Sequence, residues 1–389
     1  MKKQWWAALA AVAVLGAAVF FLVVPPVVDG KLNVTLDKGP YAVSQRAASL
    51  HKTLFVADLH DDALLWNRDL LQRYDRGHAD LPRLLEGPQA LQVFATVTKS
   101  PKGLNYERNG ADSDSITMLA MAQRWPTRTW SSLLERALYQ GEKLHAAARD
   151  SGGRLVVVKS RADLQAFVAQ WRQDPHRVAA LLATEGLHPL EGKLENVDRL
   201  FDAGFRMTGL THFFDNEVAG SAHGLEKGGL TPFGRSVVQR LQDKGVLIDL
   251  AHASKPAIDD VLAITKKPVL VSHTGVVGTC PGPRNLTDDH LQRIAATGGV
   301  IGIGYWDGAV CEPSVSNIIR AIRYAVDKVG VAHVALGSDF DGSTTTPFDV
   351  RGLGLITQGL LEAGYSEADV RAIMGGNVQQ LLLAQLPER

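Results

Sequence analysis

Eight short apolar runs, separated by amphipathic segments, are the feature that most constrains how this chain of 389 residues can fold. The runs are TLFVADLH, ALQVFATV, AALLATEG, FRMTGLTH, GVLIDLAH, PVLVSH, GVIGIGYW and HVALGSDFDG. Near-continuous apolar strands that alternate with helices are typical of a parallel sheet whose outer face is covered. Eight such units predict a closed (β/α)₈ barrel, and a doubly wound open sheet is the alternative architecture.

The segments between the runs carry start and stop signals of helices. Thr231 and Pro232 provide an N-cap and a first-turn proline, and Gly245 ends the same helix. Gly330 ends the helix that precedes the eighth run. The long interval 98–179 is expected to hold extra helices and, within RLVVVKS, a minor strand.

The N-terminus carries an uncharged apolar run, Trp5–Val24, directly after Lys2 and Lys3. At about 1.5 Å per residue, the run covers the roughly 30 Å hydrocarbon core of a bilayer. No Ala-x-Ala pattern follows it, which favours an uncleaved signal anchor over a signal that is cleaved to release a secreted, periplasmic protein. The positive-inside rule keeps the lysines in the cytoplasm and places the catalytic body outside, in the periplasm if the cell is bacterial.

These features divide the chain into an expected signal anchor (1–29), a linker with a lead-in helix (30–50) and a barrel domain (51–389). Lys plus Arg and Asp plus Glu number 41 each, so there is no basic field for nucleic acid, and no nucleic-acid partner is expected. The two cysteines, Cys280 and Cys311, are too few for a disulfide scaffold. One disulfide or two free thiols are both compatible with this number.

Metal-binding types of side chain stand where the predicted strands end. They are His60, Asp62, Glu185, His212, His252, His273 and Asp339. In a parallel barrel the carboxyl ends of the strands meet at one mouth, where the active sites of this fold lie. Each residue alone is readily explained as a hydrogen-bonded histidine, a helix cap or a turn aspartate. Their joint placement at six strand ends indicates a site for zinc or a similar divalent metal.

The ordered motifs DLHDD, ATEGLH, LTHFFDN, IDLAHAS, VSHTG, PRNLTDD and GSDFDG resemble those of the membrane (renal) dipeptidase family of zinc peptidases, over residues about 50–380. The first motif is specific, because it reads H-x-D where related amidohydrolase barrels have H-x-H. The resemblance implies a first zinc ion on His60 and Asp62 and a second on His252 and His273. It also implies that Glu185 bridges the two ions.

The resemblance further implies how substrate is held and attacked. His212 would bind the substrate's carbonyl oxygen, Arg284 would receive its terminal carboxylate, and Asp339 would stand beside the water that bridges the metals. The family has a tyrosine after strand seven that helps hold the substrate carboxylate. In this sequence only Tyr305 is a loose candidate for that position. Cys280 and Cys311 resemble a disulfide-bonded pair of the vertebrate members.

The expected function is that of a membrane-anchored dinuclear zinc dipeptidase, which attacks the peptide bond of a dipeptide with a metal-bridging hydroxide. In this scheme His212 stabilises the oxyanion, and Asp339 acts as general base and then acid. The alternative is a metal-dependent amidohydrolase of the same fold that acts on another amide, a lactam or an N-acyl amino acid. A non-catalytic envelope binding protein is disfavoured, because a binder has no need of a proton shuttle. Side-chain preference and a homodimeric state are left open.

Overall fold

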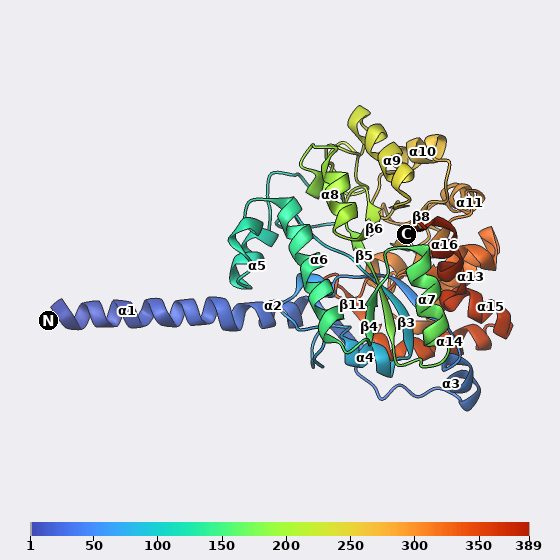
Figure 1. Ribbon diagram of the computed structural model, residues 1–389, viewed down its shortest axis with the longest axis horizontal. Helices are drawn as coiled ribbons and strands as arrows, with labels where there is room; N and C mark the ends of the chain where they lie inside the picture. Colours follow the sequence, from blue (N-terminus) through green and yellow to red (C-terminus); the bar gives the residue numbers. More distant parts are fainter. Residues whose placement is uncertain (1, 389) are drawn as a thin grey trace.

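The computed structural model describes residues 2–388, which form a barrel with one long helix projecting from it (Figure 1). The barrel strands are β2 (Val56–Asp61), β3 (Gln89–Phe94), β5 (Val178–Thr184), β6 (Phe205–Gly209), β7 (Leu247–Asp249), β8 (Leu270–Thr274), β9 (Val300–Ile303) and β10 (Val334–Leu336). Every neighbouring pair is parallel, β10 pairs with β2 and β3 pairs with β5, so the sheet closes. The predicted (β/α)₈ barrel is confirmed, and its closure rules out the open sheet.

Each of the eight apolar runs forms one barrel strand. Strands β3, β5, β6 and β8 are buried at every residue, because helices cover their outer face and side chains fill the barrel interior. The minor strand predicted within RLVVVKS is also present, as β4 (Leu155–Val157), which pairs with the beginning of β5. Because β4 pairs only with β5, it is not part of the closed barrel, which has eight strands within residues 2–388.

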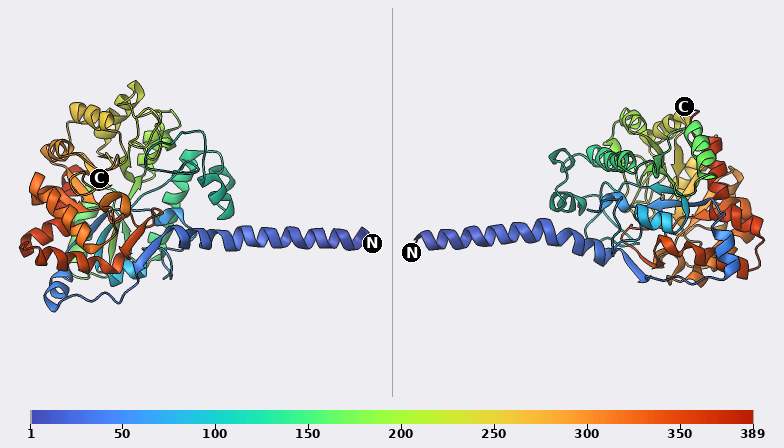
Figure 2. Two further views of the ribbon diagram at one scale, coloured as in Figure 1. Left: turned by 180° about the vertical axis from the view of Figure 1, so that it is seen from behind. Right: turned by 60° about the horizontal axis from the view of Figure 1, so that its bottom comes forward.

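Helices surround the barrel on its outside (Figures 1 and 2). They are α3 (Gln45–His51), α4 (Leu81–Glu86), α5 (Ile116–Ala122), α6 (Leu133–Asp150), α7 (Arg161–Trp171), α8 (Asn196–Asp202), α9 (Pro232–Lys244), α10 (Lys255–Ile264), α11 (Asp288–Ala296), α12 (Asp307–Val310), α13 (Val315–Val329), α14 (Leu353–Glu362), α15 (Glu367–Arg371) and α16 (Asn377–Gln385). The helix start and helix end predicted for α9 are confirmed. The Thr231 hydroxyl accepts a hydrogen bond from the Gly234 amide, and Gly245 ends α9 at a φ of 71°.

The apolar N-terminal run lies in one long helix that projects away from the barrel (Figure 2). It consists of α1 (Lys2–Ala18), a π-helical turn (Val19–Val23) and α2 (Val24–Leu32). The π turn ends two residues before Pro25, which like Pro26 lacks the amide proton that a regular helix would use there. Residues 3–32 are long and apolar enough to cross a membrane, and their most apolar stretch is not buried against the rest of the protein.

The segment expected to be a linker with a lead-in helix, residues 30–50, contains a helix and also a strand that the sequence analysis does not predict. It includes the end of α2, the strand β1 (Val34–Asp37) and the helix α3. Strand β1 pairs in parallel with β11 (Thr345–Phe348), which follows the loop at the end of β10. This small sheet therefore holds the end of the N-terminal helix beside the barrel mouth.

Candidate active site at the barrel mouth

The structure brings the seven side chains predicted from the strand ends into one buried cluster. His60 and His273 lie within β2 and β8, Asp62 and Glu185 directly follow β2 and β5, and His212, His252 and Asp339 lie shortly after β6, β7 and β10. All seven are at most 7% exposed. Because parallel strands open at the same end of a barrel, residues far apart in the chain converge there.

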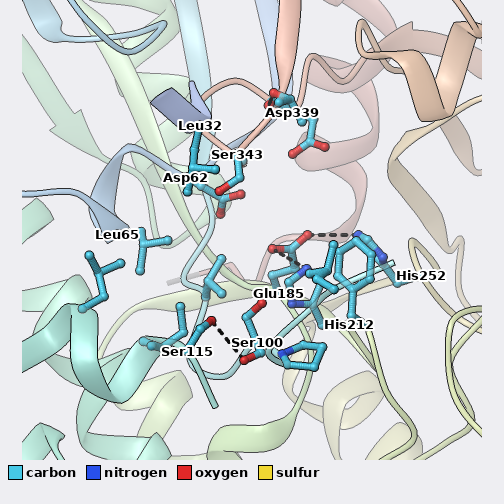
Figure 3. Close-up of a pocket in the computed structure, with 18 of the residues that line it drawn as sticks. Leu32, Asp62, Leu65, Ser100, Ser115, Glu185, His212, His252, Asp339 and Ser343 are labelled. Atoms are coloured by element: carbon cyan, nitrogen blue, oxygen red, sulfur yellow. Dashed lines mark hydrogen bonds and ion pairs between the residues drawn. The ribbon is translucent and has the colours of Figure 1, made fainter. Parts of the chain in front are cut away.

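Glu185 is the centre of the cluster. Its Oε1 lies 3.4 Å from His60 Nε2, 3.1 Å from His252 Nε2 and 3.4 Å from His273 Nε2. Its Oε2 lies 3.3 Å from His212 Nε2. Figure 3 shows His212 and His252 turned toward the Glu185 carboxylate. One carboxylate is thus shared by four imidazoles, an arrangement typical of a bridging metal ligand.

The backbone is strained at two of these positions. His252 and Asp339 have φ values of 60° and 61°, in the left-handed region that non-glycine residues rarely adopt. Side-chain hydrogen bonds hold both turns, from Thr211 Oγ1 to the His252 carbonyl at 3.1 Å and from Thr344 Oγ1 to the Asp339 carbonyl at 2.7 Å. Strain that is maintained in this way is common at functional sites, where it directs a side chain into the centre.

A further layer of carboxylates lies beneath the cluster. Asp249 accepts hydrogen bonds from the amide and hydroxyl of Ser272, and the Ser272 hydroxyl lies 2.8 Å from His273 Nδ1 and 3.3 Å from His60 Nδ1. Asp58 accepts a hydrogen bond from the His60 amide at 3.1 Å. Such contacts orient imidazoles toward a metal. The sequence analysis did not single out these acids, although a charged residue inside an apolar strand run is a signal for them.

The histidines determine the ionisation of Glu185. Burial disfavours its charged form, but His212 and His60, together with hydrogen bonds from His252 and His273, hold its pKa well below the ordinary value. The carboxylate is therefore anionic at the centre of the cluster. An anion among imidazole nitrogens is the electrostatic setting that a divalent cation completes.

The net pKa shift of the other two acids is in the opposite direction, because burial outweighs their favourable contacts. Burial raises the pKa of Asp339 well above the ordinary value, and with the nearby charge of Glu185 it raises the pKa of Asp62 to about 6. Burial also lowers the pKa of His252 and of His273 well below the ordinary value. Both imidazoles are thus neutral at physiological pH, which is the form that binds metals.

The donor set fits a divalent metal. His60 Nε2 and Asp62 Oδ1 are buried and have no hydrogen-bond partner among residues 2–388. Three sets of ligand atoms lie within 4.8 Å of one another: His60, Asp62 and Glu185; Glu185, His212 and His252; and His60, Asp249 and His273. Imidazole and carboxylate ligands in this number suit zinc, and more donors are present than one tetrahedral ion uses.

A cavity of about 590 Å³ opens above the cluster. Asp62, Glu185 and Asp339 line its inner end together with His212 and His252. Four aromatic residues also line it, Trp66, Tyr106, Phe213 and Trp306, and Trp306 Nε1 donates a hydrogen bond to the Tyr106 hydroxyl at 2.9 Å. Tyr106 belongs to the long insertion after β3, where the sequence offers no pattern that would have identified it.

Tyr305 does not take part in this cavity. Its side chain is fully buried between Phe340 and Phe348, with ring-centre distances of 5.8 and 5.5 Å. Its hydroxyl has no hydrogen-bond partner among the described residues, and burial raises its pKa well above the ordinary value. The loose match of Tyr305 to the family's tyrosine is therefore wrong, and Trp306, its neighbour in the chain, faces the cavity instead.

Arg284 lies at the edge of the cluster. Its guanidinium donates to the His273 carbonyl and stands 5.5 Å from the centre of the Trp306 ring. Cys280, in the same loop, forms a disulfide with Cys311, with the two Cα atoms 5.5 Å apart. The disulfide that the resemblance implied is thus present. It ties the loop that carries Arg284 to the segment that follows β9.

Comparison with known proteins identifies the family. A family model described as Membrane dipeptidase (Peptidase family M19) matches residues 44–385. The chain belongs to this family. The dipeptidase aclJ of Aspergillus oryzae is 28% identical over 353 residues, which cover 84% of this chain and 77% of the relative.

Two solved structures extend the comparison to the fold. The dipeptidase AC, a metallo peptidase, aligns with a TM-score of 0.71 at 25% identity and covers 87% of this chain and 100% of its own. A metallo peptidase from Rhodobacter sphaeroides, liganded with a phosphinate mimic of the dipeptide L-Ala-D-Ala, aligns with a TM-score of 0.71 at 24% identity and covers 86% and 99%. The membrane dipeptidase assignment from the motifs is confirmed, and the protein is a metal-dependent hydrolase of the dipeptidase type.

Proposed function

We propose that this membrane dipeptidase homologue is a dinuclear zinc enzyme that cleaves free dipeptides outside the cytoplasm. The observation that carries the proposal is the shared position of Glu185, with one oxygen facing three imidazoles and the other facing a fourth. Donors of both proposed ligand sets, His60 in one and His252 and His273 in the other, lie within 3.4 Å of this single carboxylate, as a ligand that bridges two ions requires. A single-ion site would leave several of these donors unused.

The ligands divide into two sets around Glu185. His60 and Asp62, whose Nε2 and Oδ2 atoms are 3.5 Å apart, would hold one ion. His252 and His273, whose Nε2 atoms are 3.0 Å apart, would hold the other. When bound, the ions supply Lewis acidity and lower the pKa of a water molecule toward neutrality. This provides a nucleophile without a serine or cysteine.

Three residues of the chain would handle the substrate. His212 faces the cavity and would donate a hydrogen bond to the scissile carbonyl oxygen as negative charge grows on it. Asp339 would accept a proton from the attacking water and pass it to the leaving nitrogen. Arg284 would receive the substrate's terminal carboxylate, because a guanidinium donates two parallel hydrogen bonds to a carboxylate. The Rhodobacter neighbour bound to a dipeptide mimic supports a substrate of this size.

The N-terminal helix would anchor the enzyme in a membrane, with the barrel on the side away from the cytoplasm. Its length and composition support an anchor. The Cys280–Cys311 disulfide supports an oxidising compartment, where such bonds persist. Labelling of protein isolated from the cell envelope, denatured without reductant, should find no free thiol. Two labelled thiols per chain would contradict export.

The decisive experiment uses the full chain in detergent. Metal is stripped with a chelator, and hydrolysis of free dipeptides, N-acyl amino acids and a lactam is measured with and without added zinc. We expect zinc to restore hydrolysis of dipeptides, with two ions per chain by elemental analysis. Restored cleavage of the other amides without dipeptide cleavage would contradict the substrate class. Full activity with one ion per chain would contradict the dinuclear centre.

A further inference from the structure

The outer part of the cavity has an apolar wall that includes the end of the N-terminal helix. This wall is formed by Val28, Leu32, Leu65, Leu104, Ile116 and Leu119. The first two belong to α2, and the last three belong to the insertion between β3 and α6. Leu32 and Leu104 are each 43% exposed, whereas Leu65 and Ile116 are 5% exposed and pack with Val28 and Leu119 in an apolar cluster. Exposed leucines that line an active-site cavity offer a surface that a ligand can cover.

Buried polar contacts hold α2 in this position. Asp29, which is 1% exposed, pairs with Arg68 at 3.1 Å and with Arg76 at 3.0 Å. Arg68 also pairs at 2.7 Å with Asp341, two residues after Asp339. The helix is therefore connected to the loop that carries a candidate catalytic acid. Its residues Val28 and Leu32 line the cavity in this arrangement.

The segment after α2 adds to this attachment. Asn33 donates a hydrogen bond to Asp29 at 2.8 Å and accepts one from the Ser343 amide at 2.9 Å. The pairing of β1 with β11 then continues along the same loop. The helix end, the following strand and the loop after β10 thus form one connected unit.

Leu32 and Leu65 of the wall lie beside a different metal ligand from the one that Arg284 contacts. Leu32 and Leu65 lie near Asp62, away from His252, in Figure 3. Arg284 is instead attached to the His273 carbonyl and stands over Trp306. In the binding mode proposed above, the substrate carboxylate faces Arg284, and a dipeptide that extends across the cluster has its amino-terminal residue on the side of Asp62 and the apolar wall.

We propose that the apolar wall is a specificity subsite for a long apolar side chain on the amino-terminal residue of the dipeptide. The inference rests on the proposed dipeptidase function and names its substrate class. A volume of about 590 Å³ is in the range that holds drug-sized ligands, which is more than two small residues need. A long apolar side chain removes the exposed leucines from water, and this favours its binding.

The test compares two substrates that differ in one side chain. Zinc-loaded full-length protein in detergent is given alanyl-alanine and 2-aminooctanoyl-alanine, and kcat/KM is measured for each. The longer substrate is expected to be hydrolysed with a kcat/KM at least about tenfold higher. A ratio near one, with both substrates cleaved, overturns the subsite and leaves the dipeptidase function intact. Cleavage of neither substrate overturns both.

Two valines of α2 provide a matched pair of variants. Val28 lines the cavity, whereas Val27 is 45% exposed and is not part of the lining. Successive helix residues point about 100° apart, so Val28→Ser and Val27→Ser make the same chemical change on different faces. Val28→Ser is expected to lower the substrate ratio about tenfold and Val27→Ser to leave it unchanged. If the ratio of the two kcat/KM values is the same in both variants, the subsite is overturned. A fall shared by both variants would come from the polarity of the helix or from detergent, and no fall in either would mean that Val28 does not contact the substrate.

Discussion

The inner end of the cavity and its apolar wall are built on different principles. The inner end is polar and buried, and its side chains come from the carboxyl ends of barrel strands, with Glu185 at the centre. The apolar wall comes from α2, from the turn after β2 and from the insertion before α6. The barrel therefore carries the chemistry, and segments added to it carry the shape of the substrate pocket. A change at the inner end should affect every substrate, and a change in the wall should affect the choice among them.

The largest effect is expected for Glu185→Gln. An amide lacks the negative charge that two cations require, so hydrolysis of every dipeptide should become undetectable, and bound zinc should fall by elemental analysis. Glu226→Gln is a matched control, because Glu226 is exposed and is not one of the residues of the cluster. If the Glu185→Gln variant keeps two ions and its activity, Glu185 is not at the metal centre. The contrast between a catalytic inner end and a selective wall then fails.

Asp339→Asn should separate metal binding from catalysis. An asparagine cannot shuttle a proton, so kcat should fall about 10²–10⁴-fold for short and long substrates alike. Elemental analysis should still find two ions per chain, since Asp339 is not assigned as a ligand. A near-normal kcat would show that Asp339 has been given the wrong role.

Arg284→Ala probes the edge of the inner end on the side of Trp306. Loss of a charged hydrogen bond of about 1.5–3 kcal/mol should lower kcat/KM for free dipeptides about 10–100-fold, chiefly through KM. Dipeptide amides, which lack the carboxylate, serve as the control and should be affected much less. Equal losses on acids and amides would argue against a carboxylate contact.

Asp29→Asn should have the smallest catalytic effect, because Asp29 supports the wall and touches no substrate. The kcat/KM for a long apolar substrate should fall by less than about tenfold, equivalent to ~1.4 kcal/mol. The free energy of unfolding should fall by about 1–3 kcal/mol, since Arg68 and Arg76 lose a buried charged partner. Chemical denaturation measures this, with the exposed Asp75→Asn as control. A loss as large as that of Asp339→Asn would erase the distinction between wall and inner end.

Much of the inner end is readable from the chain because its signals are local. The strand sequence VADLHD indicates both a buried strand and a polar carboxyl end. Because the carboxyl ends of parallel strands meet at one mouth of a barrel, His60 is then expected near residues such as His273. Caps such as Thr231 are equally local. The layer of Asp249 and Ser272 is less visible, because its meaning depends on two neighbouring strands whose distance the sequence does not state.

The strand pattern and the motifs were thus sufficient for the barrel, the family and the cluster around Glu185, since periodicity and residue type encode them within a few positions. The apolar wall was decided only in the tertiary structure. Asp29, Arg68 and Asp341 belong to three separate segments, and their ion pairs turn a helix end that reads as part of an anchor into one side of a substrate cavity. Such contacts join residues that are distant in the sequence and form only when the whole chain has folded. They produce no periodic pattern in the amino-acid sequence.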